Sequence, residues 1–192
     1  MEVTVILRLA ALFLLVLPMS CTSLGEVLAL RNVDFRIANV SNVKLAGINL
    51  ARITSFDQLG LTDVAQLGAA ALSNKMVLDF ALVVEGTNPP DNAQARMVKL
   101  DWSLFLDGKE TIQGVFDDKV AFPPGKPTNF PIAMRLDLLE FFDGGAEELV
   151  KLALSFTGAD AGAGKLHLMG TPTINTALGP MEFPRPVTIY QH

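Results

Sequence analysis

Apolar and polar side chains alternate along several segments of the chain, and this alternation predicts half-buried β-strands. The segments with a period of two are 76–84, 98–106, 112–116 and 130–138. Every second side chain of a strand lies on the same face of its sheet, so one face of each segment is expected in a core. Asp107-Gly108 predicts a hairpin turn between the second and third segments, and Pro123-Pro124-Gly125 predicts the turn before the fourth.

Weaker patterns complete a set of about eight strands. The additional segments are 27–37, 43–53, 166–174 and 181–189, the last two being joined by a loop through Leu178-Gly179-Pro180. Pro131 lacks an amide donor, which favours an edge strand or the start of a strand. Trp102 shares its parity with Leu100 and Leu104, so we expect it in the core on the inner face of the sheet, with a ligand platform as the alternative.

Two segments have a helical period instead. In 62–72, Asp63 and Gln66 stand at capping-box spacing before an apolar stripe. In 146–157, Glu147 and Glu148 occupy the first turn, where carboxylates interact favourably with the helix dipole, and the glycine-rich segment 158–164 that follows is expected to be a loop. Short strands in mostly antiparallel order predict a mainly β fold. We expect an immunoglobulin/fibronectin-III-like antiparallel β-sandwich with two inserted helices.

The first twenty residues differ from the rest of the chain. An uncharged apolar run of nine residues occupies 9–17 and follows Arg8. Nine residues of helix rise about 13–14 Å, less than half of a hydrocarbon core of about 30 Å. The run is therefore too short to span a membrane and is typical of a secretory signal peptide, which we place at residues 1–20.

The segment Leu17-Pro18-Met19-Ser20-Cys21 resembles a bacterial lipobox, in which the peptide before the cysteine is cut and the cysteine is lipidated. Ser20 fits the small residue required before the cysteine, whereas Pro18 and Met19 depart from the usual residues. The resemblance implies that Cys21 is the lipidated N-terminus of the mature protein. Ordinary signal cleavage and a retained membrane anchor are the alternatives.

This resemblance also divides the chain and places it in the cell. It implies a lipidated N-terminus with a short tether at residues 21–26 and a folded domain at 27–192. The residue after the cysteine is Thr22 rather than the Asp that retains enterobacterial lipoproteins at the inner membrane. The resemblance therefore implies an outer-membrane lipoprotein facing the periplasm.

Five motifs follow one another in the middle of the chain. They are the pair Asn88-Pro89 after an apolar strand, the pattern Val-x-Leu-x-aromatic-x-Leu at 98–104 before the turn at Gly108, Ile112-Gln113-Gly114, the turn Pro124-Gly125, and the apolar strand 130–136. In this order they resemble the late-embryogenesis-abundant type-2 family, also called the water-stress and hypersensitive-response domain. The prolines near the end, in 180–189, are similar to the family's closing strands. The resemblance covers 28–190 and implies a stress-protective or interaction role.

Composition narrows the classes of function. The 192 residues are 50% hydrophobic and 18% charged, too apolar for a disordered chain. Fifteen basic and twenty acidic residues give a net charge of −5, so we expect no nucleic-acid partner. The single cysteine excludes an internal disulfide framework and a cysteine-cluster metal site.

Patterns that would indicate catalysis are weak. His167 lies inside a predicted strand, and the only other histidine is His192. The serines lack a Gly-x-Ser-x-Gly elbow, so no hydrolase triad is expected. Gly164-Lys165 lacks the earlier glycine and the following hydroxyl of a phosphate loop. We therefore expect neither an enzyme nor a bound cofactor.

Two groups of carboxylates are the candidates for weak Ca²⁺ binding. They are Asp117-Asp118 and the cluster Asp137, Glu140 and Asp143. Both lack the spaced ligand series of a dedicated calcium loop, so we expect solvated turn carboxylates and no metal site.

Two classes of function remain. The first is a non-catalytic envelope domain tethered by lipid at Cys21, with the membrane as its partner and a stress-protective or interaction role. The second is a carrier of lipid or another apolar ligand, in which the helices cover an open end of the sandwich and leave a cavity. The further partner is accordingly an apolar ligand or an envelope protein.

Overall fold

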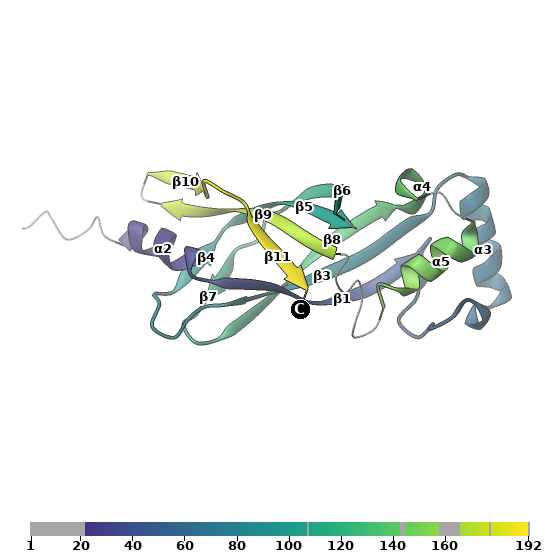
Figure 1. The fold of residues 1–192 in the computed structure, drawn as a ribbon, viewed down its shortest axis with the longest axis horizontal. Helices are drawn as coiled ribbons and strands as arrows, with labels where there is room; N and C mark the ends of the chain where they lie inside the picture. The colour runs from purple at the N-terminus through teal and green to yellow at the C-terminus, as the bar shows by residue number, and fades with distance from the viewer. Residues whose placement is uncertain (1–21, 107, 143–144, 158–165, 177, 192) are drawn as a thin grey trace, which may run out of the picture.

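Strands make up about half of the chain that the structure, a computed structural model, describes: residues 22–106, 108–142, 145–157, 166–176 and 178–191. The helices are α2 (Thr22–Arg31), the 3-10 turn η1 (Phe56–Gln58), α3 (Leu61–Leu72), α4 (Leu138–Phe141) and α5 (Ala146–Leu154). The strands are β1 (Asp34–Leu45), β2 (Ile48–Asn49), β3 (Val77–Thr87), β4 (Ala95–Met97), β5 (Lys99–Leu106), β6 (Lys109–Phe116), β7 (Val120–Phe122), β8 (Pro127–Asp137), β9 (Leu166–Thr176), β10 (Gly179–Glu182) and β11 (Val187–Gln191). Figure 1 shows an elongated domain with α2 at one end and α3 and α5 at the other.

One hydrogen-bonded sheet contains nine of the described strands. Its path is β6-β5-β9-β11-β1-β3-β8, with β10 beside β9 and β2 beside β1, while β4 and β7 form a separate pair. The fold is mainly β and mostly antiparallel, as predicted, but β1 and β11 pair in parallel. The predicted hairpin between 98–106 and 112–116 is confirmed, since Leu106 pairs with Lys109. β8, which carries Pro131, ends the path, as predicted for an edge strand.

The sheet bends so that its two ends meet across the core. Phe116 in β6 and Phe130 in β8 lie at opposite ends of the path, yet their ring centroids are 5.3 Å apart. Phe122 of β7 packs edge-on against Phe35 of β1, with 5.4 Å between centroids. The two halves of the sheet therefore face each other as in a β-sandwich. The likeness to immunoglobulin and fibronectin type III domains stays a prediction.

Trp102 lies on the inner face of the sheet, as predicted, and is 7% exposed. Its Cα partners on the two neighbouring strands are Gly114 and Gly170. A Cβ atom on Gly114 would stand 2.5 Å from a ring carbon of the indole, so the missing side chain makes room for the ring. The space lined by Phe35, Leu100 and Phe130 has a volume of about 10 Å³, which is at most the space of a single water molecule. This part of the interior is filled by side chains.

A single strand, β1, replaces part of the two weak strands predicted near the N-terminus. Its pairing with β3 shifts register after Ile37 and again after Ser41. The inward residues Ile37, Val40 and Val43 are consequently three positions apart instead of two. These bulges break the alternation, which is why the pattern suggests two strands. The strand predicted at 43–53 is wrong beyond Leu45, because β1 ends there and only β2 follows.

The predicted last strand, 181–189, is also wrong as one element. β10 ends at Glu182 and β11 begins at Val187, with Pro184 and Pro186 between them. Proline has no amide hydrogen to donate to a neighbouring strand, so the intervening residues leave the ladder. This irregular segment forms one wall of the groove described below.

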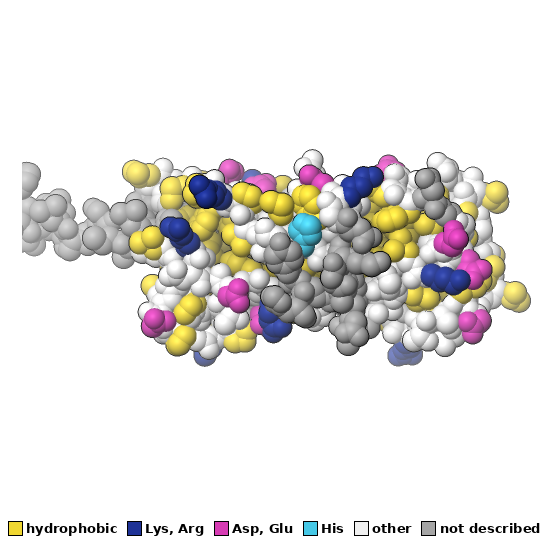
Figure 2. Space-filling model, in the orientation of Figure 1, with side chains coloured by type: hydrophobic (Ala, Val, Ile, Leu, Met, Phe, Trp, Pro, Cys, Tyr) yellow, Lys and Arg dark blue, Asp and Glu magenta, His cyan; other side chains and the backbone are white. Residues whose placement is uncertain are grey.

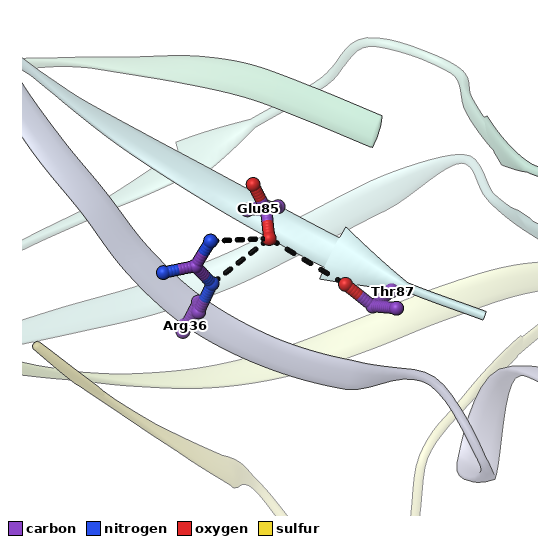
Figure 3. A network of polar contacts seen from close by, with 3 residues as sticks. All are labelled: Arg36, Glu85 and Thr87. Atoms are coloured by element: carbon purple, nitrogen blue, oxygen red, sulfur yellow. Dashed lines mark hydrogen bonds and ion pairs between the residues drawn. The ribbon is translucent and has the colours of Figure 1, made fainter. Parts of the chain in front are cut away.

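Charged pairs on the outer face join neighbouring strands. Arg36 and Glu85 are Cα partners on β1 and β3, and the guanidinium Nε of Arg36 donates to Glu85 Oε1 at 2.8 Å (Figure 3). The hydroxyl of Thr87 lies 3.5 Å from the same carboxylate oxygen. These are partly exposed contacts, which lend the sheet only modest stability.

The two predicted helices are present at the end of the domain opposite α2. α3 starts one residue early, and Asp63 Oδ2 accepts a hydrogen bond from the amide of Gly60 at 3.0 Å. The predicted pairing of Asp63 with Gln66 is wrong, because Gln66 Nε2 instead donates to the carbonyl of Ala46 at 2.6 Å. In α5, Glu148 accepts from the Gly145 amide at 2.9 Å, which confirms a first-turn carboxylate. None of the described helices is both long and apolar enough to cross a membrane.

Candidate functional site

The N-terminal helix begins directly after the predicted lipidation site. Cys21 and the predicted signal peptide 1–20 lie outside the described residues, as does the predicted loop 158–164. The strand predicted from residue 27 is wrong as far as Arg31, because residues 22–31 form α2. Ala29, Leu30 and Val33 are buried, and this spacing of one and four positions fits a helical face and not the alternation of a strand. The residues of the predicted tether after Cys21 are thus helical.

α2 is held on the domain by packing and by a buried polar network. Ala29 and Leu30 are each 1% exposed, and the helix packs against β4 and β9. Asn92 Nδ2 donates to the carbonyl of Ala29 at 2.8 Å and to Asn88 Oδ1 at 2.7 Å. Asn92 thereby connects the helix to Asn88, whose side chain is wholly buried.

Asn88, of the pair Asn88-Pro89, forms the corner where the chain leaves β3. It is wholly buried, and its Nδ2 donates to the carbonyls of Phe122 at 2.7 Å and Ala93 at 3.0 Å. The side chain of Asn88 therefore bonds to the backbone of the loop that follows it and to the backbone of β7. Through Asn92 and Asn88 together, the C-terminal part of α2 is connected to the sheet.

A groove of about 750 Å³ lies between α2, the start of β1 and the segment from β10 to β11. Its lining residues are Leu28, Leu30, Arg31, Val33, Phe35, Pro172, Met181, Glu182, Phe183, Pro184, Arg185, Pro186 and Val187. Most are apolar, and the volume falls in the range of about 300–1,000 Å³ that is typical of small-molecule sites. Leu28 is 60% exposed and Met181 is 41% exposed. Figure 2 shows hydrophobic and basic side chains side by side at this end of the domain.

The charges at the groove are two arginines and one glutamate. Arg31 and Arg185 are both exposed, and neither forms an ion pair with another described residue. Glu182 is close to Lys99, whose pKa is raised first by its contact with Asp101 and to a smaller extent by Glu182. The groove therefore presents apolar walls with two unpaired cationic groups.

A second, more polar hollow of about 680 Å³ lies on the outer face of β5, β6 and β9. Ser103 Oγ donates to Glu110 Oε1 at 2.9 Å on this face. His167 is half-buried nearby and stacks on Phe105, with 4.7 Å between ring centroids. This ring contact accounts for the position of the histidine that the sequence singled out.

The carboxylates considered for Ca²⁺ have structural surroundings. Asp137 Oδ1 accepts from the amides of Met76 at 2.9 Å and Leu139 at 3.3 Å, so it caps α4 and closes the start of β3. Glu140, Asp117 and Asp118 are exposed, and Asp143 lies outside the described residues. Within the described ranges, no three His, Cys, Asp or Glu side chains gather into a metal site.

Sequence reasoning missed the groove because its walls come from distant parts of the chain. One wall lies in residues 28–35 and another in 181–187. The sequence pattern of both segments predicts regular strands. The prolines at 184 and 186 were the feature of the sequence that indicated otherwise.

Comparison with known proteins adds little to this geometry. No protein-family model matches the chain, and no curated protein sequence matches it. Among solved structures, the chain is similar to one described as "Crystal structure of protein from Archaeoglobus fulgidus", with a TM-score of 0.32 and 13% identity. The match covers 58% of this chain and 83% of that chain. A TM-score this low establishes neither a shared fold nor a shared function.

Proposed function

We propose that this chain is a non-catalytic domain of the cell envelope, tethered to a membrane by lipid on Cys21. The observation that carries the proposal is that a packed helix of the domain begins at the residue after Cys21. A short apolar run and a small residue precede Cys21, and α2 starts at the next residue and is buried against the domain at Ala29 and Leu30. The ten residues of α2 rise about 15 Å, so the anchor connects to the domain through a packed helix.

The role of the tethered domain is proposed from the resemblance to late-embryogenesis-abundant type-2 domains. That resemblance is supported by the buried corner at Asn88 and the turn at Gly125, whose amide donates to the carbonyl of Asn88 at 2.8 Å. A stress-protective or interaction role in the periplasm, at the outer membrane, follows from the two resemblances together.

Labelling with radioactive palmitate tests the anchor. Cys21→Ala is expected to abolish labelling and to move the protein from the membrane fraction, or to leave an unprocessed precursor. Ser23→Ala, two residues away, is the control and is expected to label and fractionate like the original chain. Labelling of the Cys21→Ala variant at the original level would contradict the proposal.

The groove beside α2 favours a second candidate function, the binding of an apolar ligand. Its size and its apolar walls are those of a small-molecule site. Native mass spectrometry of the purified protein is expected to detect a bound lipid. A protein that carries only its covalent acyl groups would contradict this second candidate.

A further inference from the structure

The groove beside α2 combines apolar walls with cationic side chains. Its walls are mostly apolar. Val33 comes from the N-terminal part of the chain and Phe183 from the C-terminal part, and Leu28 and Met181 are exposed to solvent. Arg31 and Arg185, which form no ion pair with another described residue, belong to the same lining. A molecule that satisfies both needs a hydrocarbon part and an anionic group, because guanidinium binds phosphate through a fork of N–H donors.

The position of the groove narrows the source of such a molecule. Leu28 lies six residues after Thr22, the first residue of α2, which is a helical rise of about 9 Å. If Cys21 carries acyl chains, this end of the domain is the part next to the lipid surface. The net charge of the chain is −5, but Arg31 and Arg185 outnumber Glu182 in the lining, so this end carries local positive charge that attracts an anionic surface.

We propose that the groove holds an acyl chain of an anionic phospholipid and that Arg31 and Arg185 bind its phosphate. The proposal deepens the second candidate function and rests on the proposed anchoring only for the source of the lipid. The exposed sides of Leu28 and Met181 are then covered by hydrocarbon. The phospholipid belongs to the membrane in which the chain is anchored.

Photo-crosslinking in vesicles tests this occupant. The full chain is reconstituted into phosphatidylcholine vesicles with or without phosphatidylglycerol, each with a trace of phospholipid that carries a photoactivatable acyl chain. Cross-linked peptides are then mapped by mass spectrometry. We expect cross-links in 28–35 and 181–187, and a higher yield in the vesicles that contain phosphatidylglycerol.

Matched charge variants separate phosphate binding from general attraction. Arg31→Gln and Arg185→Gln are each expected to lower the cross-link yield in anionic vesicles about fivefold, and the pair more than either alone. The control is the double variant Arg52→Gln and Lys75→Gln, which removes two positive charges beside α3, at the other end of the domain. This control is expected to leave the yield at the groove unchanged.

Variants of the apolar walls test the hydrocarbon part. Leu28→Gln and Met181→Gln change side chains that are already exposed, so the thermal unfolding curve should be unaffected while the cross-link yield falls.

Equal yields in both kinds of vesicle, equal effects of the control double variant, or the lack of cross-links in 28–35 and 181–187 would overturn the proposal. The readout is independent of palmitate labelling. Loss of the groove cross-links with Cys21 still labelled refutes the groove alone, and the reverse result refutes only the anchor.

Discussion

The two ends of the domain each carry a helix, but the helices are attached in different ways. At one end, α2 places Ala29 and Leu30 in the core, and the half-buried side-chain amide of Asn92 donates to its backbone. At the other end, Leu67 is the buried residue of α3, and the bond from Gln66 to Ala46 is exposed. A helix with few buried contacts and exposed hydrogen bonds can unfold locally while the rest of the fold persists. We therefore expect α2 to unfold with the core and α3 to open by itself.

The outer side of α3 adds to this contrast. Leu61 and Leu72 are each 92% exposed, and Val64 is 43% exposed. Apolar side chains in water contribute nothing to the docking of the helix. At the end of α2, by comparison, the exposed apolar residues border a groove with cationic groups.

The largest difference between the two ends is expected when the main buried leucine of each helix is shortened. Leu30→Ala should lower the free energy of unfolding by about 2–5 kcal/mol, because it leaves a cavity between α2 and the sheet. Leu67→Ala should lower the global value less and should mainly increase hydrogen exchange of the amides in residues 61–72. Denaturant titration and hydrogen exchange measure the two effects. Equal losses of global stability would show that α3 belongs to the cooperative core.

A smaller difference is expected from the side-chain amides that hold the helices. Asn92→Ala leaves the carbonyl of Ala29 and Oδ1 of Asn88 without this donor, at a cost of about 1–3 kcal/mol. Gln66→Ala is the matched change at the other end, and water can replace its exposed bond, so the cost should be about 0.5 kcal/mol. The two losses of stability are measured from the midpoints of denaturant titrations, provided that the dependence of the free energy of unfolding on denaturant is unchanged. A larger loss for Gln66→Ala would reverse the comparison.

The smallest effect is expected from an ion pair on α5. Lys151 Nζ lies 2.8 Å from Glu147 Oε1, and this contact raises the pKa of the lysine above its ordinary 10.5. A raised pKa in the folded state means that the pair stabilises the fold below pH 10.5 and that this stabilisation is lost as the pH rises through the folded-state pKa. The Lys151→Gln variant should therefore unfold at a slightly lower denaturant concentration than the original chain at neutral pH. At high pH the two should unfold at the same concentration. A difference that grows with pH would contradict this assignment.

The sequence predicted those parts of the fold in which one local pattern has one meaning. The even positions of 76–84 and 100–106 all point inward, so their alternation identifies the strands and the burial of Trp102. The pattern failed at α2, since a short run such as Leu28-Ala29-Leu30 fits a helix or a strand. It also failed along β1, where bulges shift the inward positions.

The candidate site was predictable only in part. Cys21 is a property of the linear sequence and needs no fold to be noticed, and it stays a prediction. The groove depends on the packing of residues 28–35 against 181–187, about one hundred and fifty positions apart, and no local pattern contains such a contact. Arg31 and Arg185 belong to segments whose pattern predicts strands, and in a strand a charged residue indicates only the outward face.

The parallel pair of β1 and β11 bears on the order in which the domain is assembled. In the sheet, β11 stands between β9 and β1, so residues 187–191 join the half made of β6, β5 and β9 to the half made of β1, β3 and β8. A chain that is synthesised or exported from its N-terminus holds both halves before it holds the strand between them. Pairing across such a long stretch of chain is slow to form. The two halves of the sheet therefore join only once residues 187–191 have emerged, and until then β1 and β9 each keep an unpaired edge on the side that β11 covers.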